Sequence, residues 1–271
     1  VSTLDNRREA YAESQNTYGS YQTWKNNVSF GTGLINGHFT VDGLLSRIAS
    51  DGYMNRAASD LKSYYFAAGY QANTHAIGDR GVRNVLDAYE QAGATPADRF
   101  RVEHFQIVAP SDFPRLAQHG IIASMQPTHA TSDMPWAEAR VGPERIKGAY
   151  AWRTVLNSGA RLPLGSDFPV EDVNPFFGLY SAVTRQDQQG NPPGGWYPAQ
   201  KLTLPEAIRG FTSDAAYAAF EESSRGTIEP GKLADLTIVE GDLYAAPQSQ
   251  LFATKVRYTV VGGEIVHAGV R

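Results

Sequence analysis

The sequence predicts an α/β fold of the (β/α)8, or TIM-barrel, type, and three observations support this prediction. Short apolar runs alternate with helical patterns, which implies parallel strands joined by crossover helices. The predicted strands end near residues 42, 75, 104, 126 and 167, and such a barrel uses roughly 31 residues per strand-helix unit. Residues able to bind a metal follow three of these strands, at the end where barrels of this type carry their chemistry.

Length and composition limit the classes of protein that fit. With 271 residues, 42% of them hydrophobic, the chain can form one large domain with a small appendage. A net charge of -4 with scattered signs argues against a nucleic-acid partner. No long apolar run and no basic-then-apolar leader is visible, so we expect no membrane association and take the cytoplasm as the expected location. The absence of cysteine excludes disulfides and cysteine-ligated zinc, although it fits either redox setting.

The region before residue 70 is predicted to be mostly helical. Residues 5–26 contain no proline, and four aromatic residues among them lie near helical spacing, which predicts a helix that begins near Asp5 and packs one face. A short strand that ends in a turn is expected over residues 37–43. A second helix is expected over residues 54–68, with Gly69 as its C-terminal cap.

From residue 70 to residue 167 the pattern alternates between strands and helices. Apolar runs mark the strands, while helical periodicity followed by Gly or Pro marks the helices and their ends. The predicted strands are residues 70–75, 100–104, 121–127 and 161–167, and the predicted helices are residues 79–92, 111–119 and 144–157. The segment 128–133 is expected to be a loop.

The pattern changes after residue 167. Residues 186–199 are rich in Gln, Gly and Pro and predict a loop. The wider segment 171–200 carries several aromatic residues, which could form a lid, an apolar pocket wall or surface packing. Residues 203–220 predict two helical segments. A strand that ends at residue 239 and a hairpin near the C-terminus predict a small β appendage, so we divide the chain into a partial barrel, 1–224, and a β-sandwich portion, 225–271.

Three potential metal ligands, His75, His104 and Asp167, follow successive strands. Neutral imidazole and carboxylate suit zinc and similar divalent metals. Either histidine alone could be a hydrogen-bonded loop residue, and Asp167 alone could cap a helix, but their recurrence at the same strand end favours a metal site. A bound metal would generate hydroxide near neutral pH, and Asp167 is placed to carry the proton as general base.

Three further residues are candidates for substrate binding. His129 follows a strand in a Gln-Pro-Thr-His context, which suits a substrate contact better than a buried ligand. Asp79 and Arg80 open a predicted helix, where they are either an N-cap with a surface charge or a pair that supports the site. His119 and His267 are expected to be structural.

Five stretches, taken in order along the chain, carry a resemblance to a known family: residues 74–80, 102–104, 124–129, 165–170 and 228–236. Together they resemble the amidohydrolase superfamily, and in particular its branch of metal-dependent hydrolases that includes N-substituted formamide deformylase. The resemblance implies a metal-dependent barrel with a flanking β-sandwich and one or two divalent ions, zinc above all. It also implies hydrolysis of an amide-type, non-peptide carbon-nitrogen bond in a small molecule. It makes His75 and His104 ligands from the fifth and sixth strands and Asp167 the eighth-strand ligand.

The sequence departs from the family pattern at two places. The paired histidines of the family's first strand are absent, because no histidine precedes His38. Relatives commonly carry a metal-bridging lysine where this chain has His38, which is therefore a candidate ligand or a substitute. Because only five or six of eight strands are visible, we expect a barrel incomplete at its N-terminus, with a missing N-terminal half or a second copy of the chain as partner. The alternative function is a catalytically inactive barrel fragment that acts as a binding or assembly module.

Overall fold

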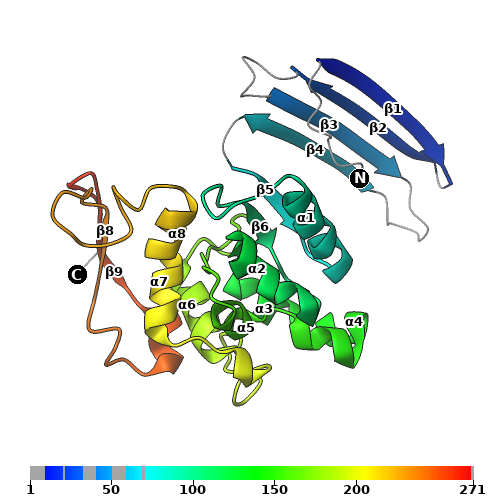
Figure 1. Cartoon of the computed structure of the whole chain (residues 1–271). Coiled ribbons are helices and arrows are strands. Elements are labelled where there is room, and N and C mark those ends of the chain that lie inside the picture. Colours follow the sequence, from blue (N-terminus) through cyan, green and yellow to red (C-terminus); the bar gives the residue numbers. More distant parts are fainter. Residues whose placement is uncertain (1–9, 21, 33–40, 51–58, 69–70, 270–271) are drawn as a thin grey trace. The chain divides into compact units, whose positions relative to one another are not determined.

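The computed structural model describes residues 10–20, 22–32, 41–50, 59–68 and 71–269. The chain forms two compact units, residues 1–72 and residues 73–271 (Figure 1). The predicted boundary between a partial barrel and a β-sandwich portion, at residue 225, falls within the second unit. It stays a prediction.

The first unit contains a four-stranded antiparallel sheet, so the two helices predicted for this region are wrong. Its strands lie in sequence order: β1 (Tyr11–Gly19), β2 (Thr23–Gly31), β3 (Val41–Ser50) and β4 (Ser59–Ala68). Tyr18 lies opposite Trp24 in the β1–β2 pair, with ring centroids 4.7 Å apart. The aromatic spacing that resembled a helix face therefore comes from a cross-strand pair.

The turn predicted near residue 43 is also wrong, because β3 runs through this position. Gly43 lies opposite Phe30 on the neighbouring strand, and a Cβ atom at Gly43 would meet the Phe30 ring at 2.4 Å. The glycine thus makes room for an aromatic ring that covers it. Residues 37–40 of the predicted strand, including His38, lie outside the described residues.

The second unit is built on a parallel sheet of strands β5 (Asn73–Ala76), β6 (Arg101–His104) and β7 (Ile122–Ser124), in that order. These strands confirm the apolar runs predicted around residues 75, 104 and 126. The fourth predicted strand is reduced to one parallel bridge between Met125 and Leu164. Because all four segments run in the same direction, their carboxyl ends open on one edge of the sheet.

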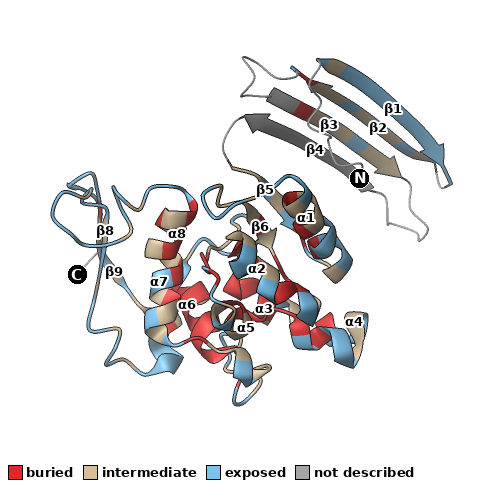
Figure 2. Cartoon of the chain, viewed as in Figure 1, coloured by how far each residue is buried: buried red, intermediate tan, exposed pale blue. Residues whose placement is uncertain are grey.

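Helices lie around this sheet, and Figure 2 shows in red that many residues of these helices and strands are buried. The helices are α1 (Asp79–Gln91), α2 (Phe113–His119), α3 (Pro127–Asp133), α4 (Ala137–Arg145), α5 (Trp152–Asn157), α6 (Pro175–Thr184), α7 (Leu204–Phe211) and α8 (Ser213–Ala218). In the part of the chain that the structure describes, no helix is long and apolar enough to cross a bilayer.

Helix α1 follows the sequence signals closely. Val82, Leu86 and Tyr89 recur at helical spacing and are buried, and Gly93, with a φ of 75°, takes the left-handed conformation that ends a helix. The loop predicted over residues 128–133 is wrong, because this segment forms α3. Pro127 occupies the first turn of α3, where its fixed φ suits a helix and its missing N–H costs no hydrogen bond.

The predicted helix over residues 144–157 is interrupted. It comprises the end of α4, a 3-10 turn over Ile146–Gly148 and α5. The two helical segments predicted over residues 203–220 are confirmed as α7 and α8. Helix α6 was not predicted.

The C-terminal strands form an antiparallel sheet in the order β10-β9-β8. They are β8 (Leu236–Val239), β9 (Val256–Val261) and β10 (Glu264–Ala268), and the last two form the predicted hairpin. Gly262 and Gly263 both have positive φ in its turn, which suits a two-residue hairpin loop. The packing of this sheet into a β-sandwich stays a prediction.

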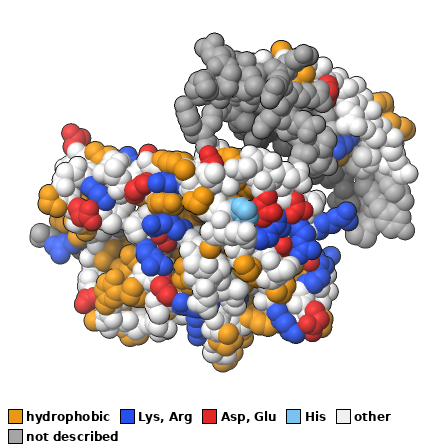
Figure 3. All heavy atoms as spheres, in the orientation of Figure 1, with side chains coloured by type: hydrophobic (Ala, Val, Ile, Leu, Met, Phe, Trp, Pro, Cys, Tyr) orange, Lys and Arg blue, Asp and Glu red, His pale blue; other side chains and the backbone are white. Residues whose placement is uncertain are grey.

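Acidic side chains on the helices of the second unit are held largely by arginine. Arg115 reaches Asp87 and Glu90, each at 2.6 Å, and Arg153 pairs with Glu206. On the face shown in Figure 3, basic and acidic side chains are interspersed. These pairs hold each charge beside an opposite one and form a fixed electrostatic frame around the sheet.

Candidate metal centre

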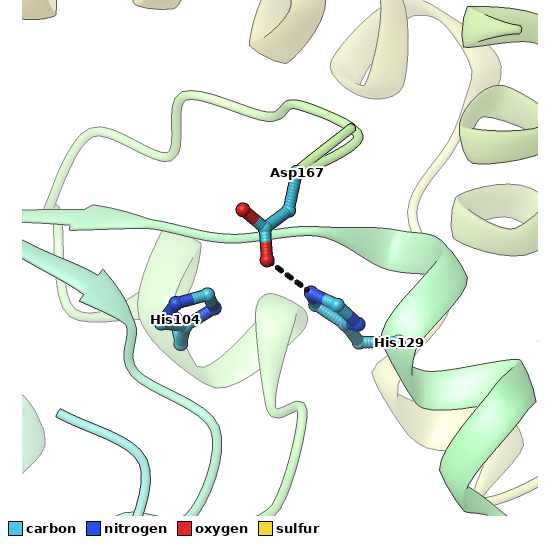
Figure 4. Close-up of side chains that lie close together, drawn as sticks. All are labelled: His104, His129 and Asp167. Atoms are coloured by element: carbon cyan, nitrogen blue, oxygen red, sulfur yellow. Dashed lines mark hydrogen bonds and ion pairs between the residues drawn. The ribbon is translucent and has the colours of Figure 1, made fainter. Parts of the chain in front are cut away.

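Three side chains converge at the carboxyl edge of the parallel sheet (Figure 4). Each of His104, His129 and Asp167 offers one ligand atom, and these atoms all lie within 4.8 Å of one another. His104 is the last residue of β6, His129 lies in α3 just after β7, and Asp167 follows the bridge at Leu164. Parallel strand direction thus brings residues distant in sequence into one cluster.

The chemistry of this donor set fits a divalent ion such as zinc. The Nε2 atom of His129 lies 3.2 Å from Oδ2 of Asp167. Tetrahedral zinc with bonds of about 2.1 Å to nitrogen and oxygen places neighbouring ligand atoms about 3.4 Å apart. Two imidazoles and one carboxylate also leave a position open for water, as catalytic zinc sites do.

A hydrogen bond presents one nitrogen of His104 to the cluster. Its Nδ1 atom lies 3.0 Å from the amide oxygen Oε1 of Gln126. An amide oxygen only accepts, so Nδ1 carries the hydrogen and Nε2 keeps a free lone pair. Burial, and then the neighbouring His75, lower the pKa of His104 and favour the neutral ring that a metal requires.

His129 lies between two carboxylates. Its Nδ1 atom is 3.3 Å from Oε1 of Glu171, while Nε2 faces Asp167, and its side chain is only 10% exposed. If Nε2 binds a metal, Nδ1–H donates to Glu171, which is the carboxylate-histidine arrangement that orients metal ligands. Sequence reasoning missed Glu171 and Gln126. Glu171 lies four residues after Asp167, and Gln126 lies just after β7. Neither position indicated a contact with a histidine.

The backbone at the cluster is strained. His104 has a φ of 74°, and Asp167 has a φ of 62°. Non-glycine residues rarely adopt positive φ, and each such residue costs roughly 1–3 kcal/mol unless its surroundings hold it. Phe105, which follows His104, also has positive φ and is fully buried, so its packing anchors the turn. Strain of this kind concentrates at functional sites.

The other predicted site residues are less tightly grouped. The side chain of His75 lies next to that of His104, with the two ring centroids 4.4 Å apart. His75 is not one of the three residues in the 4.8 Å cluster. His38 lies outside the described residues. The roles predicted for both residues stay predictions.

Asp79 is the first residue of α1, and Gly78 occupies the N-cap position, so Asp79 is not the N-cap. Its carboxylate accepts hydrogen bonds from Arg145, at 2.7 and 2.9 Å, and from the backbone N–H of Arg80. The bond from Arg145 is the main cause that lowers the pKa of Asp79. The substrate-binding role of Asp79 and Arg80 stays a prediction.

A cavity of about 330 Å³ adjoins the cluster. Glu171 connects the two, because it lines the cavity and contacts His129. Nine of the ten lining residues have polar side chains, and seven of the ten come from the segment 171–200. The lining residues are Thr128, Thr131, Ser132, Glu171, Asp172, Phe177, Ser181, Asp187, Gln188 and Gln189. The segment therefore forms part of a pocket wall, to which Phe177 is the aromatic contributor.

Comparison with known proteins gives consistent matches. The amidohydrolase family matches residues 52–267. The protein LONG AFTER FAR-RED 3 of Arabidopsis thaliana is 37% identical over 211 residues, 75% of this chain and 36% of that protein. N-substituted formamide deformylase of Arthrobacter pascens is 29% identical over 231 residues, 82% of this chain and 41% of that protein. The chain thus spans about two fifths of the length of these curated relatives.

A solved structure is also similar. The crystal structure of an uncharacterized metal-dependent hydrolase from Pyrococcus horikoshii OT3 superposes with a TM-score of 0.57 and 28% sequence identity. The match covers 65% of this chain and 35% of that one. Both the sequence and the arrangement of strands and helices therefore lead to the same group of α/β proteins.

Proposed function

Because the chain belongs to the amidohydrolase family, we propose that the protein is a metal-dependent hydrolase that cleaves an amide-type, non-peptide carbon-nitrogen bond in a small molecule. The observation that carries this proposal is the convergence of His104, His129 and Asp167 within 4.8 Å. The 29% identity to N-substituted formamide deformylase supports the choice of a carbon-nitrogen bond.

In this proposal His104, His129 and Asp167 hold the metal, with His75 as a further candidate ligand beside His104. A bound divalent ion would act as a Lewis acid and would lower the pKa of water, so that hydroxide is available for attack near neutral pH. The same assignment makes β5, β6, β7 and the segment around Leu164 part of a barrel within residues 1–224, and β8–β10 part of a β-sandwich within residues 225–271.

The protein's own groups orient the ligands and move the proton. Gln126 hydrogen-bonds Nδ1 of His104, which leaves Nε2 for the metal, and Glu171, 3.3 Å from Nδ1 of His129, would orient that ring in the same way. The Asp167 side chain is 35% exposed and so remains accessible to water and substrate. We assign it as the general base, which takes a proton from the attacking water and delivers it to the leaving nitrogen.

The test combines metal analysis with a panel of small amides and formamides. We expect hydrolysis that a chelator abolishes and a divalent ion restores, and a loss of at least about 100-fold in kcat/KM on His104→Ala. His119→Ala is the matched control, because His119 lies at the end of α2 and contacts Glu90. A folded, metal-loaded protein that hydrolyses none of the panel would favour the binding-module alternative.

A further inference from the structure

His129, a proposed metal ligand, lies on a helix that is too short to fix its own orientation. Helix α3 has seven residues, Pro127–Asp133. Isolated helices shorter than about 12 residues are marginal in water, so tertiary contacts hold them in place. Residues 127–130, in the first half of α3, are buried. The rotation of α3 about its axis therefore depends also on the contacts at its other end.

Asp133 holds that other end of α3. The hydroxyl of Tyr150 donates a hydrogen bond to Oδ2 of Asp133. Asp133 and His129 are four residues apart, so they lie on the same face of the helix, one turn from each other. The hydroxyl contact between Ser181 and Thr131, at 3.2 Å, lies on a different face, because Thr131 is two residues from His129. A rotation of α3 that breaks the bond at Asp133 would thus also turn the imidazole of His129 away from the cluster.

Tyr150 is itself held in place by contacts outside α3. It is 3% exposed, and its ring packs on that of Trp196, with the centroids 5.6 Å apart. Its backbone N–H donates to the carbonyl of Gln106 at 2.7 Å, and its own carbonyl accepts from Nη1 of the buried Arg185 at 2.9 Å. Its φ of 48° is one that a non-glycine residue keeps only where its surroundings hold it. The hydroxyl therefore has a fixed position, and Asp133 must meet it there.

The chemistry of this hydrogen bond suits a positioning role. Burial, and then the hydrogen bond to Asp133, raise the pKa of Tyr150, so the phenol keeps its proton and acts as the donor. Hydrogen bonds to a carboxylate are roughly twice as strong as those between neutral groups. One such bond between a fixed donor and the end of a short helix favours a single rotation of that helix.

Resting on the function proposed above, we propose that Tyr150 is a positioning residue for the metal centre: its hydrogen bond to Asp133 sets the rotation of α3 and so directs Nε2 of His129 toward the metal. Gln126 and Glu171 lie beside the ligand imidazoles themselves, whereas Tyr150 acts through the helix. Loss of the Tyr150 hydroxyl should then weaken metal binding although every ligand is still present.

Four variants of the full chain test this role through zinc affinity, measured by competition with a fluorescent chelator. Tyr150→Phe removes the hydroxyl and keeps the ring, and we expect zinc affinity to fall about tenfold, the lower end of the loss when a ligand loses its own hydrogen-bond partner. Asp133→Ala should cause a similar fall. Asp133→Asn keeps an oxygen that can accept the bond and should retain most of the affinity. The double variant Tyr150→Phe with Asp133→Ala should bind no more weakly than either single variant, because both changes remove one bond.

Tyr180→Phe is the matched control. Tyr180 is 2% exposed, and its hydroxyl donates to the backbone carbonyl of Asp187 at 3.0 Å rather than to α3. Both tyrosine variants lose a hydrogen bond of a buried phenol, and thermal unfolding would measure the stability that each loses. Only Tyr150→Phe should lose zinc affinity. Equal falls in both variants, additive losses in the double variant, or unchanged affinity in folded Tyr150→Phe would each overturn the positioning role.

Zinc affinity and hydrolysis together separate this proposal from the hydrolase proposal. If the chain binds zinc but hydrolyses no amide, weaker zinc binding by Tyr150→Phe supports the positioning role while the hydrolase proposal fails. If the chain is an active hydrolase and Tyr150→Phe binds zinc as the wild type does, the positioning role is overturned and the hydrolase proposal stands. A wild-type chain that binds no zinc overturns both.

Discussion

Two groups of carboxylates in the second unit lie in different environments. Several carboxylates on the helices face arginine, as Glu206 faces Arg153 and Asp79 faces Arg145. At the carboxyl edge of the sheet, Asp167 and Glu171 face the imidazole of His129. Arginine stays protonated and forms bidentate pairs that hold one geometry. Imidazole can bind a metal or exchange a proton, so the environment at the carboxyl edge of the sheet, where two imidazoles and a carboxylate converge, is suited to chemistry.

The largest expected effect comes from Asp167→Asn. The amide keeps nearly the same shape but cannot act as a base, and it is a poorer metal ligand than a carboxylate. We expect kcat/KM to fall by about 10³-fold or more. Glu206→Asn, a change in the arginine-paired environment, should lower stability but leave kcat/KM of the folded protein nearly unchanged. Similar losses of activity in the two variants would erase the distinction between the environments.

Glu171→Gln should have a smaller effect than Asp167→Asn, because Glu171 acts through His129. A weaker acceptor at Nδ1 holds the ring less firmly, and loss of such a partner typically costs about 10–100-fold in metal affinity or activity. Competition with a fluorescent zinc chelator would measure the change in metal affinity. Glu171→Asp, which retains the charge, should recover part of it. Unchanged metal affinity in Glu171→Gln would show that Glu171 does not orient a ligand.

The ion pair between Glu206 and Arg153 can be tested through the pH dependence of the free energy of unfolding. The hydrogen bond from Arg153 is the main cause that lowers the pKa of Glu206 to about 2 from an ordinary 4.5. A depressed pKa contributes stability above the unfolded value, and this stability is lost as pH falls toward the folded value. Glu206→Gln should therefore cost about 1 kcal/mol of unfolding free energy at pH 7.

Urea unfolding at several pH values would measure this cost. The difference between the wild type and Glu206→Gln should shrink as pH falls from about 5 to about 2. Glu264→Gln on the exposed strand β10 is the control and should show little pH-dependent difference. A cost that stays constant over this range would contradict the ion-pair explanation.

The sequence predicted best where local pattern and tertiary packing agree. Val82, Leu86 and Tyr89 mark a helix that packs on a sheet, and both their spacing and their burial favour the same structure. The proximity of His104 and Asp167 could be predicted because parallel strands bring their carboxyl ends to one edge.

Prediction failed where long-range contacts decide the structure. Tyr18 and Trp24 form a cross-strand pair, which single-sequence spacing cannot distinguish from a helix face. Nothing in the sequence indicated that His129 would lie within 4.8 Å of His104 and Asp167, and Glu171 was not considered. Both depend on side-chain directions set by the turn after β7 and the loop after residue 167, which no periodic pattern encodes.

The smallest expected effect comes from Arg145, whose side chain is 50% exposed where it pairs with Asp79. Exposed ion pairs contribute little, because water screens the attraction and holding two long side chains costs entropy. Arg145→Ala should shift the melting temperature by no more than about 2 °C. It also leaves Asp79 without its main hydrogen-bond donor, so the pKa of Asp79 should rise toward its ordinary value. Calorimetry and carboxyl NMR titration would measure both changes. A large loss of activity without a loss of stability would instead place Asp79 and Arg145 in the substrate site, as one interpretation of the sequence suggested for Asp79.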